Sequence, residues 1–264
     1  MKRWIPFVKS DPEVSVVRLQ GVIASGGRAG LSDQALAAAI EKAFRGKPVA
    51  VALEINSPGG SPVQSSLIGA RIRRLSEEKE IPVFAFVEDV AASGGYWLAV
   101  AADEIFADPN SVVGSIGVIS ASFGVDKLIS RYGIDRRVYT AGTSKSQLDP
   151  FRPEKEEDVA RLKTLLEDIH ANFIAHVTSR REGKLTSDQD LFNGEIWLAA
   201  KAKELGLIDG LGHLKPIMKE RFGDKVKFRR YGLRRPLLSR LGGQMMDDAF
   251  TQLEERAAYA QFGL

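Results

Sequence analysis

Residues 81–102 read IPVFAFVEDVAASGGYWLAVAA, and this stretch decides the fold. The apolar run over residues 81–87 predicts a buried parallel strand, and the run from Tyr96 to Ala102 predicts a core helix. Ser93 and two glycines lie between them, at a strand-to-helix turn where backbone can approach a ligand closely. Free N–H groups and the positive dipole end of the helix would surround the Ser93 hydroxyl. Ser93 is therefore a candidate nucleophile, although a helix N-cap serine packed beside small residues would give the same pattern.

A second apolar strand, over residues 49–55, ends in a similar way. It runs into Asn56-Ser-Pro-Gly-Gly-Ser61, a glycine turn at the carboxyl end of the strand. Ligands bind at this end of the strands in open α/β sheets. Gly60 and Gly94 would then present backbone N–H groups to one crevice, so we interpret them as candidate donors of an oxyanion hole.

Three motifs together resemble the signal peptide peptidase A family of serine peptidases. They are Asn56-Ser-Pro-Gly-Gly60, Ala91-Ala-Ser-Gly-Gly-Tyr96 and Gly114-Ser-Ile-Gly-Val118, and the resemblance covers roughly residues 14–215. The first motif also resembles the proteolytic subunit of the Clp protease, which shares the fold. The resemblance implies an α/β fold of the Clp protease/crotonase-like type, a spiral of strand-strand-helix units with a long helical arm. It also implies a serine endopeptidase that cleaves signal-peptide fragments or other extended apolar peptides.

A serine hydroxyl needs a base, and the chain offers three histidines, His170, His176 and His213. All three lie late in the sequence, and the first two fall on the longest helical pattern, where a packed or solvated histidine is usual. Clp-type relatives carry a histidine at a position where this chain has Val118. These observations disfavour a Ser-His pair.

The resemblance implies a Ser-Lys dyad instead. Lys145, in the loop over residues 140–153, matches the lysine that the family uses as general base, and Ser115 matches the residue that orients this lysine. A lysine can act as a base only when it is neutral, which requires a dry pocket with neutral hydrogen-bond acceptors in place of carboxylates. The other interpretation of Lys145 is a solvated surface lysine.

Two further function classes stay open on the sequence. In a crotonase-type acyl-CoA enzyme, paired backbone N–H groups would hold a thioester oxyanion, and Glu88 and Asp89 would perform the acid-base chemistry. That interpretation leaves Ser93 without a role. The other class is a non-catalytic scaffold with a peptidase-like fold.

The composition bounds the cofactors and partners. The chain has no cysteine, and its three histidines show no ligand spacing, so we expect neither a metal nor another cofactor. The formal net charge is +3, yet residues 215–240 hold ten Lys/Arg and two Asp/Glu. This basic stretch predicts a solvated face, or alternatively peripheral contact with anionic lipid. No nucleic-acid motif is present, and the expected substrate is a peptide or an unfolded protein.

The expected compartment is the cytoplasm, with contact at the inner face of the membrane as the alternative. The apolar part of residues 1–9 is about five residues long, too short for a signal peptide or a membrane span. Regular strand-helix alternation predicts one peptidase domain over residues 1–230. Residues 231–264 then read as a basic linker and an amphipathic C-terminal helix, over 245–262, for assembly.

The remaining pattern predicts the other elements. Helices are expected over 31–44, 61–80, 126–132 and 154–181, and strands over 14–23, 103–107 and 134–139. The helix over 154–181 carries more apolar positions than one layer can cover, which favours contact with another subunit. The resemblance implies a homo-oligomeric ring in which Ser93 and Lys145 come from neighbouring protomers.

Overall fold

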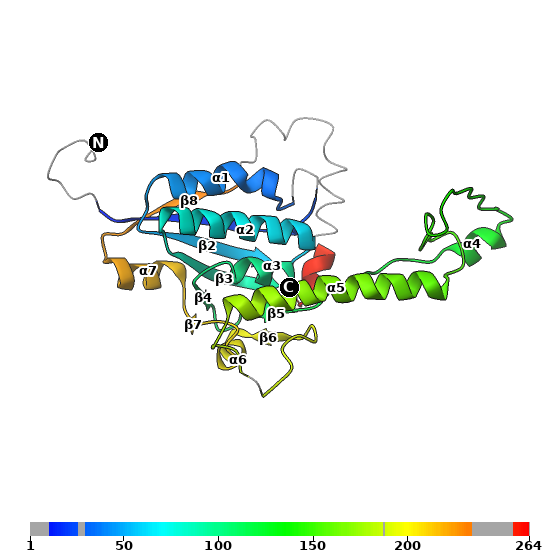
Figure 1. Cartoon of the computed structure of the whole chain (residues 1–264). Helices are drawn as coiled ribbons and strands as arrows, with labels where there is room; N and C mark the ends of the chain where they lie inside the picture. The colour runs from blue at the N-terminus through cyan, green and yellow to red at the C-terminus, as the bar shows by residue number, and fades with distance from the viewer. Residues whose placement is uncertain (1–10, 26–29, 187, 234–255, 264) are drawn as a thin grey trace.

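The structure is a computed structural model, and it describes residues 11–25, 30–186, 188–233 and 256–263 (Figure 1). Its centre is an eight-stranded sheet with the strand order β6-β5-β3-β2-β1-β8, and β4 and β7 branch from β3. All pairs are parallel except β5 with β6. The strands are β1 Glu13–Gln20, β2 Ala50–Ser57, β3 Val83–Ala92, β4 Glu104–Ala107, β5 Val112–Gly114, β6 Ile196–Leu198, β7 Gly210–Leu211 and β8 Lys227–Tyr231.

Strand β3 divides the sheet. Its first half, Phe84 to Val87, pairs with β4, and its second half, Val90 to Ala92, pairs with β5. The register between β2 and β3 shifts at the boundary of these two halves. One long strand therefore pairs with two short strands in succession, and Ser93 directly follows its C-terminal end.

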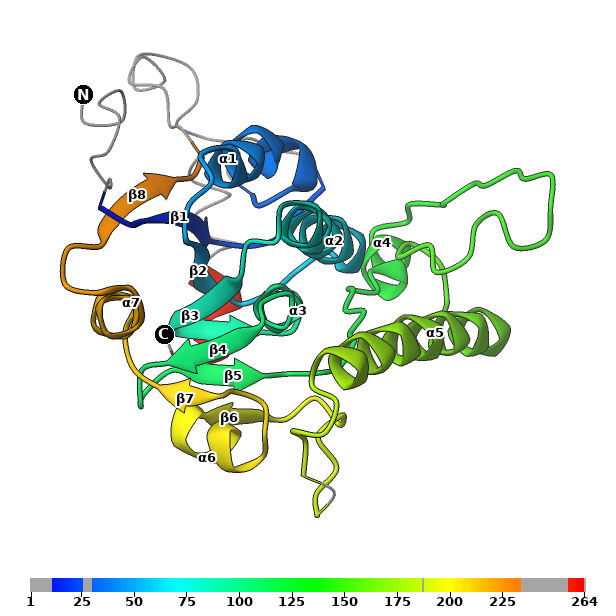
Figure 2. The ribbon, with the colours of Figure 1, turned by 60° about the vertical axis from the view of Figure 1, so that its left-hand side comes forward.

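Helices cover both faces of the sheet. Figure 2 shows α1, α2, α3 and α5 on one face and α7 on the other. Because both faces are covered, β2 is buried along its whole length, as expected for a central parallel strand. The helices are α1 Asp33–Arg45, α2 Pro62–Lys79, α3 Gly94–Ala99, α4 Asp126–Arg131, α5 Glu156–Arg180, α6 Ala199–Glu204 and α7 Leu214–Phe222.

The segment before α5 and the first part of that helix form an arm, residues 117–172, that extends away from the sheet (Figure 1). The helix buries only Asp158, Phe173 and Val177, and α4 at the outer end buries nothing. The strand predicted over 134–139 is wrong. These residues lie on the arm with no strand beside them, and Ile134 and Tyr139 are 58% and 92% exposed.

The structure also bears on the other elements expected from the sequence. The helix expected over 61–80 forms as α2, and it buries only part of its apolar residues, since Val63 and Leu67 are exposed while Ile68 and Ile72 are in the core. The sequence pattern also missed β8, whose charged residues join the edge of β1. Most of the helix predicted over 245–262 lies outside the described residues, and 256–260 are helical. The domain boundary at residue 230 stays a prediction.

The basic stretch over residues 215–240 is partly neutralised by acidic residues of the body. Arg221 pairs with Glu104, and Lys227 lies 2.8 Å from the carboxylate of Asp11. Such pairs favour a solvated face over a free cationic surface. Within the described ranges, no helix combines the length and the apolar composition that crossing a membrane requires.

Candidate active site

Ser93 occupies a strained turn between β3 and α3. Its φ of 50° and ψ of −121° lie where residues other than glycine are rare, and such strain must be held by the surroundings. The Ser93 N–H donates to the carbonyl of Gly114 at 2.8 Å, and its own carbonyl accepts from Trp97 N at 3.0 Å. Although Ser93 is at the N-cap position, its hydroxyl makes no capping hydrogen bond. Capping therefore does not account for this serine, whose side chain is only half-buried.

The two glycine turns pack backbone against backbone. A Cβ on Gly59 would lie 2.8 Å from both Ser93 Cβ and Gly94 N, and a Cβ on Gly94 would lie 3.4 Å from Gly60 N. Only glycine permits this approach, which brings Gly60 and Gly94 together beside Ser93. Among the described residues, no oxygen accepts a hydrogen bond from the N–H of Gly60 or of Gly94. Two neighbouring free donors beside a serine can stabilise an oxyanion.

Ser115 directly follows β5, as Ser93 directly follows β3, and these two strands are paired. Ala92 and Gly114 are register partners in β3 and β5, so the two serines each follow the same rung of the sheet. Ser115 also has a positive φ, 52°, and its N–H donates to the carbonyl of Glu195 at 2.6 Å. The lysine-orienting role of Ser115 stays a prediction.

Lys145 is not brought to this site within one chain. It lies in the loop of the arm, where its N–H donates to the Gly142 carbonyl at 3.3 Å, and its side chain is exposed. The arm loop is well separated from α3 in both Figure 1 and Figure 2. The structure therefore assembles Ser93, Gly60, Gly94 and Ser115 and leaves Lys145 apart.

The histidines bond elsewhere. His170 Nε2 lies 3.0 Å from the carbonyl of Ile116, and His213 Nε2 lies 3.4 Å from the carboxylate of Asp108. His176 stacks on Trp97, and burial lowers the pKa of its imidazole. Within the described part of the chain, none of the three bonds to Ser93.

Glu88 and Asp89, the candidates for acyl-CoA chemistry, are engaged away from the Ser93 turn. They line a cavity of about 600 Å³ on the α7 side of the sheet. Asp89 accepts a hydrogen bond from Asn56 Nδ2 at 2.5 Å, and burial raises the pKa of Glu88, with the nearby charge of Glu54 adding to the effect. The residues that line this cavity do not include Gly60, Ser93 or Gly94.

An α/β sheet that places a strained serine beside two free backbone donors defines a hydrolase-like site of the Clp protease/crotonase-like fold. Comparison with known proteins agrees. Residues 76–225, more than half of the chain, match the model of peptidase family S49, so the chain belongs to this family. The family and the fold expected from the sequence motifs are thereby confirmed.

Relatives of known name extend this result. A putative protease of Synechocystis sp. is 31% identical over 208 residues, which are 78% of this chain and 73% of that protein. A protein of Brucella abortus (strain 2308) named Na(+)/H(+) antiporter NhaA is 52% identical over 271 residues. That match covers 100% of this chain but only 37% of the Brucella protein. The name antiporter was given to the whole Brucella protein, so it says nothing about the matched part alone.

Solved structures share the fold at low sequence identity. The 1510-N membrane-bound stomatin-specific protease, in a serine-to-alanine mutant, superposes with a TM-score of 0.51 at 17% identity and covers 86% of this chain and 100% of its own. A lysine-to-alanine mutant of the same protease, in complex with a substrate peptide, gives the same TM-score and covers 93% and 99%. At this identity the likeness by itself shows only the fold.

Proposed function

We propose that the chain is a serine endopeptidase that cleaves signal-peptide fragments or other extended apolar peptides through a Ser93-Lys145 dyad. The observation that carries this proposal is the Ser93 turn, where a strained serine without a capping bond lies beside the N–H groups of Gly60 and Gly94, which have no acceptor among the described residues. Membership of peptidase family S49 supports the reaction class.

The residues have distinct roles in this mechanism. Neutral Lys145 accepts the proton of the Ser93 hydroxyl while Ser93 Oγ bonds to the carbonyl carbon of the substrate. The N–H groups of Gly60 and Gly94 hold the resulting oxyanion, which then collapses and expels the amine with the proton from the lysine. Water attacks the acyl-enzyme with the lysine again as base, and Ser93 recovers its proton. Ser115 would orient the lysine amine.

A neighbouring protomer supplies Lys145 in this proposal. The arm leaves large apolar side chains in water: Ile119, Phe123, Tyr132 and Tyr139 are 87%, 88%, 74% and 92% exposed. Exposed apolar groups of this size on a contiguous segment mark a protein interface. A closed homo-oligomer would cover the arm and bring its loop to the Ser93 turn of the next subunit.

The substrate class draws on relatives. A protein of Enterococcus faecium named putative signal peptide peptidase SppA is 28% identical over 211 residues, 77% of this chain. One solved neighbour is bound to a substrate peptide, and the two neighbours are mutated at a serine and at a lysine. These features support an extended peptide as substrate and a serine with a lysine as the working pair.

Active-site labelling tests the proposal. A fluorophosphonate probe should label the wild-type protein and the Ser66→Ala control, which removes an exposed serine of α2, and should spare Ser93→Ala. Cleavage of an apolar peptide should follow the same pattern. Equal labelling of Ser93→Ala would disprove the nucleophile assignment.

A further inference from the structure

The inner half of α5 binds along α3, the short helix that begins at the Ser93 turn. The ring of Phe173 lies 5.0 Å from that of Trp97, and the His176 ring stacks on Trp97 at 4.5 Å. His176 Nε2 also lies 3.3 Å from the Trp97 carbonyl, and Val177 is fully buried. Successive turns of α5 therefore follow α3 toward its C-terminal end.

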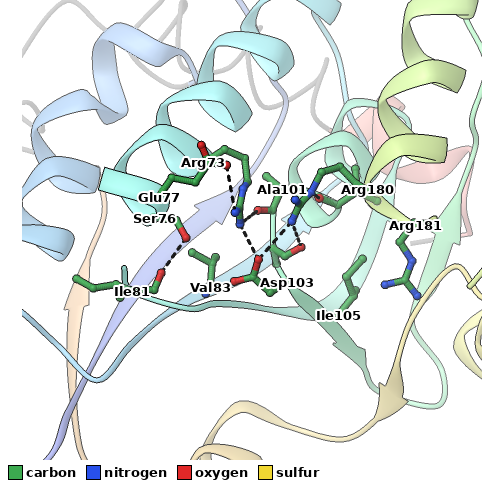
Figure 3. Close-up of polar contacts among 12 residues, drawn as sticks. Arg73, Ser76, Glu77, Ile81, Val83, Ala101, Asp103, Ile105, Arg180 and Arg181 are labelled. Carbon is green, nitrogen blue, oxygen red and sulfur yellow. Dashed lines mark hydrogen bonds and ion pairs between the residues drawn. The ribbon is translucent and has the colours of Figure 1, made fainter. Parts of the chain in front are cut away.

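Two arginines meet the carbonyl groups at that end. Arg180 Nε donates to the Val100 carbonyl at 3.0 Å, and Arg180 Nη2 donates to the Ala102 carbonyl at 2.9 Å. Arg73 Nη1, from α2, lies 3.3 Å from the Ala101 carbonyl. Val100 is the C-cap residue of α3, and Ala101 and Ala102 follow it, so the two cations lie just beyond the C-terminal end of the helix, where they complement its dipole. Figure 3 shows the two guanidinium groups approaching the end of α3 from α2 and α5.

Asp103 joins these arginines to the start of β3. One carboxylate oxygen lies 2.7 Å from Arg73 Nη1 and 3.4 Å from Arg180 Nη2. The other accepts from Val83 N at 2.9 Å, and Asp103 N donates to the Val83 carbonyl at 2.8 Å. The segment from Val83 to Asp103, with Ser93 at its tip, is therefore closed at its base.

The arrangement has an electrostatic cost. Burial lowers the pKa of Arg180, and the positive charge of Arg73 beside it acts in the same direction. Asp103 opposes both effects. Helix α3 has only six residues, and its few internal hydrogen bonds cannot fix the helix alone. The benefit that offsets the repulsion between the two arginines is therefore the anchoring of α3.

We propose that Arg180 is a positioning residue for the nucleophile: it holds the C-terminal end of α3 and thereby sets the place of the Ser93 hydroxyl and the Gly94 N–H. The inference rests on the proposed function. Since α5 carries the arm at its other end, Arg180 also links the proposed subunit contact to the nucleophile. Arg180 itself has no contact with substrate in this role.

The test compares Arg180→Ala and Arg180→Lys with Arg74→Ala. Arg74 lies on α2 and is 52% exposed, and its ion pair among the described residues is an i,i+4 pair with Glu78, so its loss removes an arginine without touching α3. Competent sites are counted with a fluorophosphonate, and kcat per counted site and KM are measured on an apolar peptide. Thermal unfolding and light scattering record stability and assembly. All assays run well below the unfolding temperature of each variant.

The expected result is specific to positioning. Arg180→Ala should lose about 10- to 100-fold in kcat per counted site with KM within about twofold, since a shift of about 1 Å at the reacting atoms has effects of this size. Arg180→Lys should fall between, because one ammonium lacks the planar fork that reaches two carbonyls. Added methylguanidinium should raise the activity of Arg180→Ala and leave the activities of the other proteins unchanged.

The contrary results are equally clear. Wild-type kcat per counted site in Arg180→Ala, even with a lower unfolding temperature or fewer competent sites, would show a structural role only and overturn the inference. Should Arg180→Ala fail to fold, unchanged kcat in Arg180→Lys would overturn it in the same way. An active Ser93→Ala would instead refute the proposed function.

Discussion

At the scale of single residues, the proposed chemistry depends on atoms that touch Ser93 and on one lysine that does not. Lys145→Ala should lose about 10² to 10⁴ in kcat, the usual effect of removing a general base, while its fold stays intact because the side chain is exposed. His170→Gln and His213→Gln should stay within about twofold of wild type, because both rings bond away from Ser93. Peptide hydrolysis measures all three. Substantial activity in Lys145→Ala would contradict the dyad.

Gly94 offers a second test at this scale. A Cβ there would lie 2.4 Å from Ser65 Oγ and 3.2 Å from Ile23 Cδ1, so Gly94→Ala should displace the N–H that faces the oxyanion. We expect about a 10²-fold loss of kcat, the size seen when an oxyanion donor is lost. The double variant Ser65→Ala/Gly94→Ala removes the closest contact and should recover part of the rate. No difference between the single and double variants would contradict this cause.

At the scale of elements, local patterns predicted what neighbouring residues determine. The strand-to-helix turn at Ser93 was predicted from two apolar runs, over 81–87 and 96–102, and the glycine pair between them. This was possible because each of these features depends on only a few neighbouring residues. The strand expected over 134–139 failed since pairing needs a partner strand, which alternation alone cannot supply. The charged strand β8 was missed for the converse reason, because its partner β1 lies about two hundred residues earlier. The contacts of Arg180 with α3 gave no local signal either.

The contact of α5 with α3 should make stability depend on pH. Burial lowers the pKa of His176 from its ordinary value of 6.5, so the unfolded chain binds the proton more tightly than the folded one. The contribution of neutral His176 to the free energy of unfolding is complete above pH 6.5 and declines as the pH falls below that value. The unfolding temperature of wild type should therefore drop between pH 7.5 and pH 5, and more than that of His176→Gln. Parallel curves for the two proteins would exclude His176 as the cause.

At the scale of the whole molecule, the arm of a single chain leaves its apolar side chains exposed. Its outer helix α4 buries no residue, and its loop carries Lys145 away from the other site residues. A charge placed in the apolar surface should block assembly, because an interface that buries an unpaired carboxylate is strongly disfavoured. Phe123→Asp should therefore give smaller particles by light scattering and lose peptidase activity. Asp126→Asn, which removes a charge at a neighbouring, partly buried arm position, is the control and should assemble.

Subunit mixing tests whether the dyad crosses an interface. Ser93→Ala and Lys145→Ala should each be inactive alone, since each lacks one member of every dyad. In a mixed ring, some interfaces join an intact Ser93 turn to an intact Lys145 loop, and random mixing at equal amounts makes that fraction about one quarter. Activity should therefore reach about a quarter of wild type after exchange. Exchange must be verified with two labels, because unmixed rings would also be inactive. Full exchange without recovery, or an active monomer, would contradict a dyad that crosses an interface and would leave the Ser-Lys chemistry itself untouched.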